Sequence, residues 1–516
     1  MATPDPVWLQ LSKKKRAIQQ AALTPWASEL SPEEAVITSI KDANELLAQI
    51  SMRALTAASV AEAYIKSLTE LCFEHALAQA HALDRYIAEH GKLLGPLHGL
   101  PVTLKDQFDV KGYDSTLGYV GRAFHPAAED AVIVAILKGL GAVVIAKTNL
   151  PQSIMWCETE NPLWGLTTNP KNPKFTPGGS TGGESALLHE RGSIIGWGTD
   201  IGGSIRIPSH MMGLYGLKPS SGRLPYQGVS VSTEGQEHVP SVVGPMARSL
   251  ATLHLVTKAV VDTEPWRQDP KVVPIPWREY EHKDVQSRPL VVGLLLDDGV
   301  VRIHPPIERV VKGVADKLLK GGHEVVPWHH DGHQECIDIM DQYYTADGGE
   351  DIRRDVMAGG EPFIPHVEAL VNKGKPITVY DYWQLNKRKV AAQKQYLDKW
   401  NAVRSPSGEE VDVLLTPVMP HTAVTHSSCR WVGYTKVWNF LDYSAVVIPA
   451  GVVDKGMDPG VDRTYQPRNE LDRWNWDLYD PESMDGMPVG VQIVGRRLEE
   501  EKVLGAAKVI ERILQN

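Results

Sequence analysis

Two serines lie in two glycine-rich turns near the middle of this 516-residue chain, and a nucleophilic hydroxyl is the chemistry that such turns suit. Ser180 lies in the run Gly-Gly-Ser-Thr-Gly-Gly (178–183), and Ser204 ends the run Asp-Ile-Gly-Gly-Ser (200–204). Glycine permits positive φ and close approach of other atoms, but it costs conformational entropy, so a cluster of glycines needs a reason. The pattern predicts a pocket of backbone N–H groups around a nucleophile.

Three further motifs accompany the serine turns in a fixed order. The run Gly-Leu-Pro-Val-Thr-Leu-Lys-Asp (99–106) precedes them, and the runs Asp-Tyr-Ser-Ala-Val-Val-Ile-Pro (442–449) and Gly-Met-Pro-Val-Gly-Val-Gln-Ile-Val-Gly (486–495) follow. Together the motifs resemble the amidase signature family of serine hydrolases, from about residue 35 to the C-terminus. The resemblance implies an amidase that needs no cofactor and acts on a small-molecule amide.

The resemblance also implies a role for three side chains. Ser204 corresponds to the nucleophile that becomes acylated, Ser180 to a hydroxyl that bridges nucleophile and base, and Lys105 to the base. The family holds the peptide bond before this bridging serine in the cis form, so Gly179–Ser180 is expected to be cis. Taken alone, Gly-Gly-Ser before Ile205 would more often be a helix cap. Taken alone, a lysine would more often lie at the surface.

Lys105 can act as a base only when its amine is uncharged. Lowering the pKa of a lysine from about 10.4 to about 7–8 requires some 3 units, or roughly 4 kcal/mol, which burial can supply. Val102 and Leu104 fit a buried strand, and Lys105 and Asp106 should point apart because successive strand residues face opposite sides. The expected cycle passes a proton from Ser204 through Ser180 to Lys105, with no histidine required.

Residues around the serines are expected to support this chemistry. The resemblance implies an oxyanion-binding loop made by the N–H groups of Ile201, Gly202, Gly203 and Ser204. Asp200 and Arg206 are expected to brace that loop through hydrogen bonds. Thr181 stands where many family members have serine, and it keeps a hydroxyl.

The substrate pocket is less well determined by the sequence. Ile154, Met155 and Trp156 lie between the lysine and serine motifs and are our hypothesis for its lining, although ordinary core residues would look the same. The segments 434–443 and 468–473 look like the acetamidase branch of the family. The sequence leaves open which amide is cleaved, whether esters are accepted and whether the chain forms a homodimer.

Four functions can be weighed on this pattern. The first is a serine amidohydrolase for small or medium primary or aryl amides. The second is an amidotransferase subunit that supplies ammonia in a tRNA-dependent complex, which the acidic charge balance disfavours. The third is a lipid-amide hydrolase at a membrane. The fourth is a non-catalytic relative used for binding, against which the intact Lys105, Ser180 and Ser204 speak.

The charge of the chain also limits its partners. The formal net charge is −10, whereas general affinity for nucleic acid or an anionic membrane needs a concentrated positive surface. The one dense basic run, at 13–16, is interpreted as the solvated face of an N-terminal helix. No nucleic-acid partner is therefore expected.

Cysteine usage and hydropathy give the expected setting. The first six residues lack the apolar region of a secretory signal, and no stretch reaches the roughly 18 consecutive apolar residues of a spanning helix. We therefore expect a cytoplasmic protein without a transmembrane segment. The histidines at 329, 330 and 333 are interpreted as part of a polar loop rather than a metal site. The sequence contains four scattered cysteines with no Cys-x-x-Cys pair: Cys72, Cys157, Cys336 and Cys429.

The elements that must position these residues follow from periodicity. We predict one α/β domain over residues 1–516, with a central mixed β-sheet flanked by helices and a helical N-terminal region (about 1–90) packed on it. Ser31-Pro-Glu-Glu is a capping-box start for a helix. The remaining predictions are strands at 101–104, 142–146, 289–296 and 323–327, helices at 130–139 and 305–320, a mostly helical stretch at 331–412, and an irregular loop at 454–485.

Overall fold

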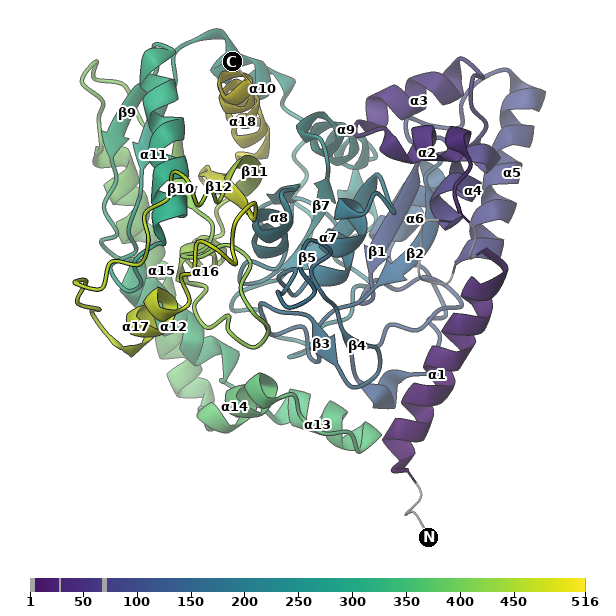
Figure 1. Ribbon diagram of the computed structural model, residues 1–516, viewed down its shortest axis with the longest axis horizontal. Coiled ribbons are helices and arrows are strands. Elements are labelled where there is room, and N and C mark those ends of the chain that lie inside the picture. The colour runs from purple at the N-terminus through teal and green to yellow at the C-terminus, as the bar shows by residue number, and fades with distance from the viewer. Residues whose placement is uncertain (1–4, 27–28, 67–71, 516) are drawn as a thin grey trace.

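A ten-stranded mixed β-sheet runs through the centre of the computed structural model, which describes residues 5–26, 29–66 and 72–515 (Figure 1). In spatial order its strands are β2 (Val143–Thr148), β1 (Pro101–Lys105), β5 (Ile195–Asp200), β7 (Val242–Ala247), β6 (Tyr215–Lys218), β11 (Ala445–Val452), β12 (Pro488–Val494), β10 (Val413–Pro417), β8 (Val291–Leu294) and β9 (Glu324–Pro327). A separate hairpin pairs β3 (Glu160–Asn161) with β4 (Gly165–Leu166). The predicted α/β domain with a central mixed sheet is confirmed.

The sheet changes character along its width. The three strands at each end, β2-β1-β5 and β10-β8-β9, are parallel, while the pairs between them are antiparallel. Every residue of β1, β2 and β5 is buried, as strands covered on both faces require. The carboxyl ends of parallel neighbours lie at one edge of the sheet, so residues that end β1 and β5 come together there.

The N-terminal region is helical, as predicted, and packs on the β2 end of the sheet (Figure 1). The predicted capping box is present, because the Ser31 side chain accepts from the Glu34 N–H and the Glu34 carboxylate accepts from the Ser31 N–H. Residues 1–4 of the region lie outside the described ranges. Its helices are α1 (Val7–Leu23), α2 (Pro32–Ser39), α3 (Ala43–Ser51), α4 (Ala57–Lys66) and α5 (Phe73–His90).

The basic run in α1 is largely exposed, as predicted, but some of its side chains also bind the body of the protein. The Lys15 ammonium lies 2.6 Å from the carboxylate of Asp114, which is buried, and Arg16 Nε donates to the Leu163 carbonyl at 2.7 Å. These bonds hold α1 against the body of the protein. Two of the four basic side chains therefore serve tertiary packing, a role that the charge pattern alone does not reveal.

The remaining helices cover both faces of the sheet. One of them, α17, corrects the prediction of an irregular loop at 454–485: the Asn469 side chain accepts from the Asp472 N–H at 2.9 Å, and Trp476 is buried. These helices are α6 (Val132–Gly139), α7 (Gly182–His189), α8 (Arg206–Met212), α9 (Leu250–Val261), α10 (Glu279–Ser287), α11 (Pro305–Lys320), α12 (His333–Tyr344), α13 (Glu350–Gly359), α14 (Pro365–Lys373), α15 (Val379–Ala402), α16 (Gly433–Phe440), α17 (Glu470–Asp477) and α18 (Glu500–Gln515).

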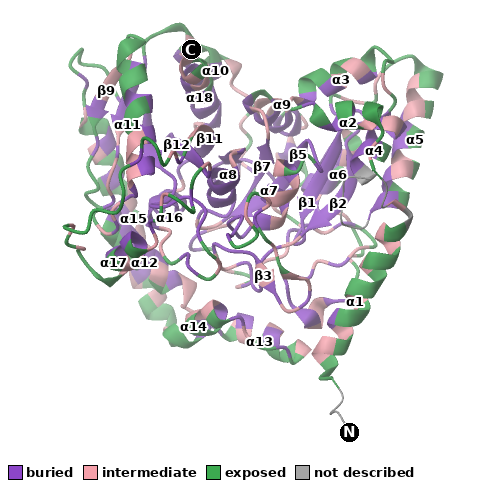
Figure 2. Cartoon of the chain, viewed as in Figure 1, coloured by how far each residue is buried: buried purple, intermediate pink, exposed green. Residues whose placement is uncertain are grey.

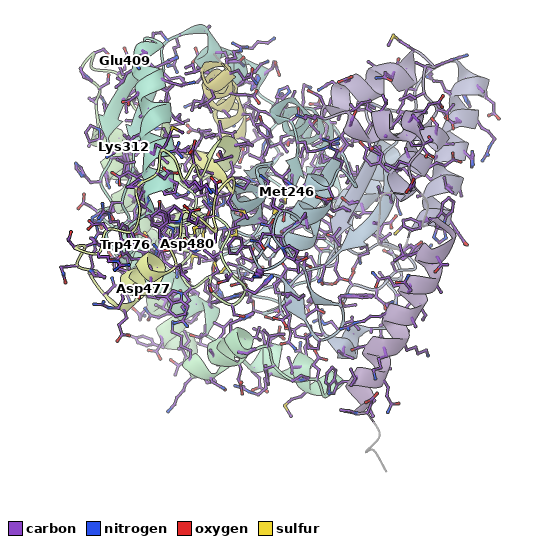
Figure 3. All side chains as sticks on the ribbon, viewed as in Figure 1. Met246, Lys312, Glu409, Trp476, Asp477 and Asp480 are labelled. Carbon is purple, nitrogen blue, oxygen red and sulfur yellow. The ribbon has the colours of Figure 1, made fainter. Side chains whose placement is uncertain are left out.

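Burial follows the layers. Buried residues concentrate on the sheet and on the inner faces of the helices, while the outer helix faces are exposed (Figure 2). Met246 of β7 lies near the middle of the molecule and is fully buried, whereas Lys312 and Glu409 lie at its rim (Figure 3). Among the described helices, none has both the length and the apolar content needed to cross a bilayer.

Candidate active site

Lys105 ends strand β1, and its amine lies next to two hydroxyl groups. Lys105 Nζ is 2.6 Å from Ser180 Oγ and 3.1 Å from Thr199 Oγ1. Thr199 belongs to β5, the parallel neighbour of β1, so the two strands deliver both side chains to the same edge of the sheet. Ser180 comes from the turn before α7, and its peptide bond with Gly179 is cis, as the resemblance implies.

Lys105 is fully buried, and its surroundings favour the uncharged amine. Burial lowers the pKa of Lys105 from 10.5 to about 7, although the nearby carboxyl groups of Asp200, Glu184 and Asp106 oppose this shift. The Asp106 carboxylate faces away from the amine, as strand alternation predicts, and accepts from the N–H groups of Thr116 and Leu117 at 2.8 Å. A substantial share of the amine is therefore neutral at physiological pH.

The two serine turns are joined through their backbones. The Thr181 N–H donates to the Ser204 carbonyl at 3.2 Å, and the Thr181 hydroxyl donates to the Thr199 carbonyl at 3.4 Å. Ser180 and Ser204 are both buried. The structure thus brings Lys105 and Ser180 into direct contact and ties the Ser204 turn to the same place.

Two hydroxyl groups from segments distant in sequence hold the backbone of the Ser204 turn. The Tyr344 hydroxyl donates to the Ile201 carbonyl at 3.0 Å, and the Thr435 hydroxyl donates to the Gly202 carbonyl at 2.7 Å. In a trans peptide the next N–H points opposite to the carbonyl, so these bonds also aim the N–H groups of Gly202 and Gly203. A side chain at Gly203 would meet Thr435 Oγ1 at 2.4 Å, and its φ of 131° favours glycine.

The N–H groups of this turn have different uses. Gly203, which was predicted as an oxyanion donor, instead donates its N–H to Asp200 Oδ1 at 2.9 Å. Within the described ranges, the N–H groups of Ile201, Gly202 and Ser204 have no acceptor. Those three groups are free to bind an anionic oxygen, whereas the N–H of Gly203 is not. Ile201 also lines the cavity described below.

A buried ion pair between Arg206 and Asp200 holds the Ser204 turn in place. Arg206 donates to both carboxylate oxygens of Asp200, from Nη2 at 2.9 Å and from Nε at 3.0 Å, and both side chains are fully buried. Its remaining donors reach Asn439 Oδ1 at 2.6 Å and Gln492 Oε1 at 3.2 Å. We refer to Asp200, Arg206, Asn439 and Gln492 as the Asp200 cluster.

The Asp200 cluster keeps its charges. Burial alone would raise the pKa of Asp200, but the guanidinium of Arg206 and the ammonium of Lys218 hold it well below its ordinary value. Asn439 adds a hydrogen bond from Nδ2 to Asp200 Oδ1 at 2.8 Å. The carboxylate also accepts from the Ile205 N–H at 3.1 Å, so it fixes the turn on both sides of Ser204.

A second buried carboxyl group, Glu184, has no cationic contact of this kind. The hydroxyls of Thr103 and Thr148 lie 2.6 Å and 2.9 Å from its two oxygens, and burial raises the pKa of Glu184 to about 8. Gly196 leaves room for it, because a side chain there would meet Glu184 Oε2 at 2.2 Å. We refer to Lys105, Ser180, Thr199 and Glu184 as the Lys105 cluster.

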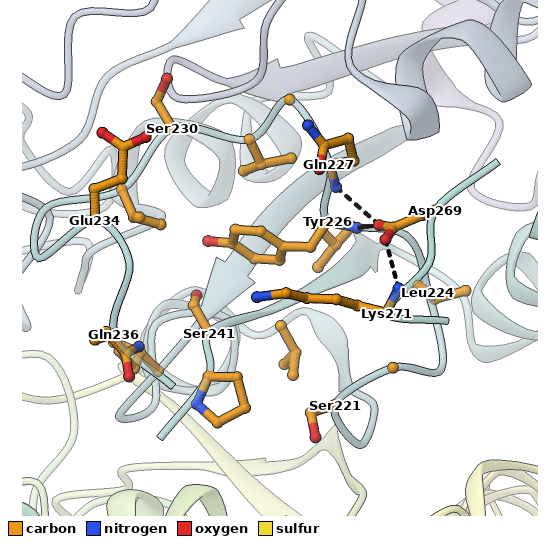
Figure 4. A pocket seen from close by; sticks show the side chains of 18 of the residues that line it. Ser221, Leu224, Tyr226, Gln227, Ser230, Glu234, Gln236, Ser241, Asp269 and Lys271 are labelled. Carbon is orange, nitrogen blue, oxygen red and sulfur yellow. Dashed lines mark hydrogen bonds between the residues drawn. The ribbon is translucent and has the colours of Figure 1, made fainter. Parts of the chain in front are cut away.

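A cavity of about 670 Å³ opens beside this edge of the sheet, and Lys105, Ser180 and Ser204 are not among the described residues that line it. Ile154 and Ile201 line it on the side of the Ser204 turn, and much of the remaining wall is polar. Figure 4 shows hydroxyl, amide and charged side chains around this space, with Asp269 anchoring the loop at Tyr226 and Gln227 through their N–H groups. The polar residues of the wall include Ser221, Gln227, Ser230, Glu234, Gln236 and Lys271.

The three residues predicted to line the pocket separate in the structure. Ile154 lines the cavity and adopts a φ of 60°, a left-handed conformation that is rare for a β-branched residue. Met155 packs against a hydrophobic cluster that includes Tyr119. Trp156 stacks on His366 with ring centroids 4.5 Å apart. Neither Met155 nor Trp156 is among the described residues that line the cavity.

Several contacts of the site are not predicted by the sequence motifs. Gln107 follows Lys105 at a spacing of two, and its Oε1 accepts from the Thr199 hydroxyl at 2.7 Å, so alternation along the chain could have suggested it. Tyr344 and Asn439 come from helices more than 130 residues away in sequence, and no local signal identifies them. Among the described residues, no group of three or more histidines, cysteines and carboxylates could hold a metal ion.

Comparison with known proteins gives the chain its relatives. The model of the family described as Amidase matches residues 51–504. The chain is 56% identical to "Amidase 1" of Gibberella moniliformis over 98% of this chain and 99% of that protein. It is 42% identical to an acetamidase of Emericella nidulans over 98% of this chain and 91% of that protein. A solved fatty acid amide hydrolase matches with a TM-score of 0.88 and 32% identity, covering 100% of this chain and 92% of that one.

Proposed function

We propose, from the premise that this chain belongs to the amidase family and is an amide hydrolase, that it cleaves small polar carboxamides through an acyl-enzyme on Ser204. One observation carries the mechanism: the Lys105 amine is fully buried, has a pKa lowered to about 7 and lies 2.6 Å from the Ser180 hydroxyl. A neutral amine in that position can accept a proton from a hydroxyl.

The proposed proton path uses three side chains. Ser204 Oγ attacks the amide carbonyl as its proton passes to Ser180, whose own proton passes to Lys105. The protonated Lys105 returns a proton through Ser180 to the leaving nitrogen, so the amine departs neutral. Water then repeats the same transfers and releases the acid. Acylation and deacylation each end with Lys105 uncharged and Ser180 protonated, as they began.

The oxyanion is proposed to bind to backbone donors of the Ser204 turn. The N–H groups of Ile201, Gly202 and Ser204 precede α8 and have no acceptor within the described ranges. Removing one oxyanion donor typically lowers kcat by about 10²–10³-fold. The Asp200 cluster supports this role because it fixes the residues on both sides of the turn.

The cavity supports a small polar substrate rather than a long acyl chain. Its wall offers hydroxyl, amide and charged side chains such as Ser230, Glu234 and Lys271. A hydrocarbon chain would remove water from these groups without forming hydrogen bonds to them, which is unfavourable. The 42% identity to an acetamidase points to the same class of substrate. The lipid-amide hydrolase and the tRNA-dependent amidotransferase are therefore the less favoured functions, and homodimer formation and cytoplasmic location stay predictions.

The test is a panel of acetamide, benzamide and oleamide, assayed with the unchanged protein and with Ser204→Ala. We expect turnover of acetamide or benzamide, no turnover by Ser204→Ala, and an acyl adduct that intact-protein and peptide mass spectrometry place on Ser204. Ser209→Ala is the matched control, because its hydroxyl only donates to the Ile205 carbonyl within α8.

Four outcomes would contradict the proposal in whole or in part. Turnover by Ser204→Ala, or an acyl group located on Ser180, would assign the nucleophile elsewhere. Preference for oleamide over acetamide and benzamide would leave the catalytic residues in place but overturn the proposed substrate class. Glutamine-dependent transfer of ammonia without net amide hydrolysis would favour the amidotransferase.

A further inference from the structure

Gln107 lies directly behind the catalytic lysine and has no role in the mechanism proposed above. Its side chain is fully buried just beyond the end of β1. The side-chain amide contacts Thr199 on one side and Ser230 on the other, and Thr199 in turn contacts the Lys105 amine. Ser230 lines the cavity, so a chain of hydrogen bonds runs from the cavity wall to the base.

The Ser230 backbone carbonyl determines which atom donates in every hydrogen bond of this series. The Ser230 backbone carbonyl can only accept, and Gln107 Nε2 lies 2.7 Å from it, so the amide nitrogen faces Ser230. Gln107 Oε1 therefore faces the Thr199 hydroxyl at 2.7 Å, and because this oxygen can only accept, the hydroxyl must donate to it. The backbone adds a second tie, since the Ser230 N–H donates to the Gln107 carbonyl at 2.9 Å.

The direction of the Thr199 hydroxyl determines how Lys105 forms its hydrogen bonds. The Thr199 hydroxyl has one proton, which it gives to Gln107, so toward the Lys105 amine it can only accept. One N–H of the neutral amine is then directed at Thr199, at 3.1 Å. The lone pair is left for the Ser180 hydroxyl, which lies 2.6 Å away on another side of the nitrogen. Without Gln107, the Thr199 hydroxyl could turn and donate to that same lone pair.

We propose that Gln107 is a positioning residue: it fixes the direction of the Thr199 hydroxyl so that the Lys105 lone pair accepts a proton from Ser180. This inference rests on the proposed function of Lys105 as the base. It assigns to the loop around Ser230 a second task besides lining the cavity, because that loop holds the amide of Gln107 in one orientation.

The first test uses two substitutions with different expected signatures. Gln107→Met removes the acceptor for Thr199 at similar volume, and we expect kcat to fall by about tenfold or more with KM nearly unchanged. Gln107→Glu keeps an acceptor but adds negative charge near the amine, which raises the pKa of Lys105. The acidic limb of the kcat/KM profile should then move to higher pH by about one unit. A merely structural role would lower the active fraction without moving this limb.

A double-mutant cycle supplies the second test. Thr199→Val removes the hydroxyl on which Gln107 acts, so adding Gln107→Met to Thr199→Val should lower kcat no further. The control is Gln79→Met in α5, where Nε2 also donates to a backbone carbonyl, that of Ala142 at 2.7 Å, and where neither kcat nor the limb should change. Active sites are counted by covalent labelling with a serine-reactive fluorophosphonate, so that folding losses are separated from slower chemistry.

The outcomes are decisive in both directions. Wild-type kcat for Gln107→Met, or losses that multiply in the cycle, would each overturn the positioning role. Failure of the underlying function looks different, because then the acyl adduct on Ser204 would be missing in the unchanged protein. The adduct is therefore established first, and the Gln107 variants are interpreted only against it.

Discussion

The Asp200 cluster and the Lys105 cluster both adjoin the Ser204 turn, yet they respond to burial in opposite ways. Asp200 and Arg206 are fully buried but stay charged, because two direct bonds and further amide contacts compensate them. Lys105 and Glu184 are equally buried but have hydroxyl neighbours instead of ionic ones, so their uncharged forms are favoured. Paired charges hold the turn in one shape, whereas unpaired groups can exchange protons near neutral pH.

The largest expected effect comes from Lys105→Met. Losing a general base typically costs about 10²–10⁴-fold in rate, and we expect a fall in kcat of that size, measured under saturating substrate. The free energy of unfolding at pH 8 should change by only about 1 kcal/mol, because the lost amine is mostly uncharged and methionine fills a similar volume. A large loss of stability would mean that the amine is charged and paired in the folded protein.

Arg206→Met is the matching change in the other cluster. It leaves the Asp200 carboxylate buried without its partner, so we expect the free energy of unfolding to fall by about 3–5 kcal/mol in urea titrations. Activity should be lost as well, because the Gly203 and Ile205 N–H groups lose a fixed acceptor. If Arg206→Met were as stable as Lys105→Met, the distinction between the two clusters would fail.

The pH dependence of the reaction sharpens the comparison further. Because burial lowers the pKa of Lys105 to about 7, the amine gains a proton as pH falls through that value. We expect kcat/KM to fall about tenfold per pH unit below about 7, measured with initial rates where chemistry is limiting. The Asp200 cluster stays ionised over the same range and adds no transition. A flat profile down to pH 5 would remove Lys105 from its proposed role.

Glu184→Gln is expected to have the smallest effect. At pH 7 the acid is mostly protonated, so an isosteric amide should leave the acidic limb of kcat/KM within about 0.3 unit of its place. Burial raises the pKa of Glu184 from 4.5 to about 8, so the folded protein holds this proton where the unfolded chain releases it. Wild-type stability is therefore lost as pH rises from about 4.5 to 8.

The measurement for Glu184 is the stability difference between the two proteins across that pH range. Glu184→Gln carries no such titration, so its advantage over wild type should grow between pH 4.5 and 8 and then level off. A difference that stays constant with pH would show that Glu184 is ionised throughout. In that case the acidic limb should also shift to lower pH in the variant, because Lys105 would have lost a negative neighbour.

The sequence predicts the local elements of this fold better than its long-range contacts. The strand at 101–104 and the helix at 305–320 appear in the structure as β1 and α11, the latter with the same bounds. Both could be predicted because apolar runs and helical periodicity depend on residues that are close in sequence. The helix α17 was missed because its cap and its buried Trp476 carry little signal within a stretch rich in proline and aspartate.

In the candidate site, too, residues within local motifs could be predicted and long-range contacts could not. Lys105, Ser180 and Ser204 could be proposed because glycine-rich turns and a lysine after an apolar run occur in ordered motifs. The partners of Arg206 could not, since Asn439 and Gln492 are 233 and 286 residues away and reach it only through the order of strands in the sheet. Tertiary structure, not local pattern, decides which amides and hydroxyls complete a buried network.

Those long-range bonds have a consequence for synthesis on the ribosome. A nascent chain that has emerged through β6 already carries Lys105, Ser180 and Ser204, yet it lacks the α16 and β12 residues that hold Arg206. The proposed reactive groups are therefore synthesised before the residues that hold the turn around them. On the proposed mechanism, we expect hydrolytic competence only once translation has delivered the last strands.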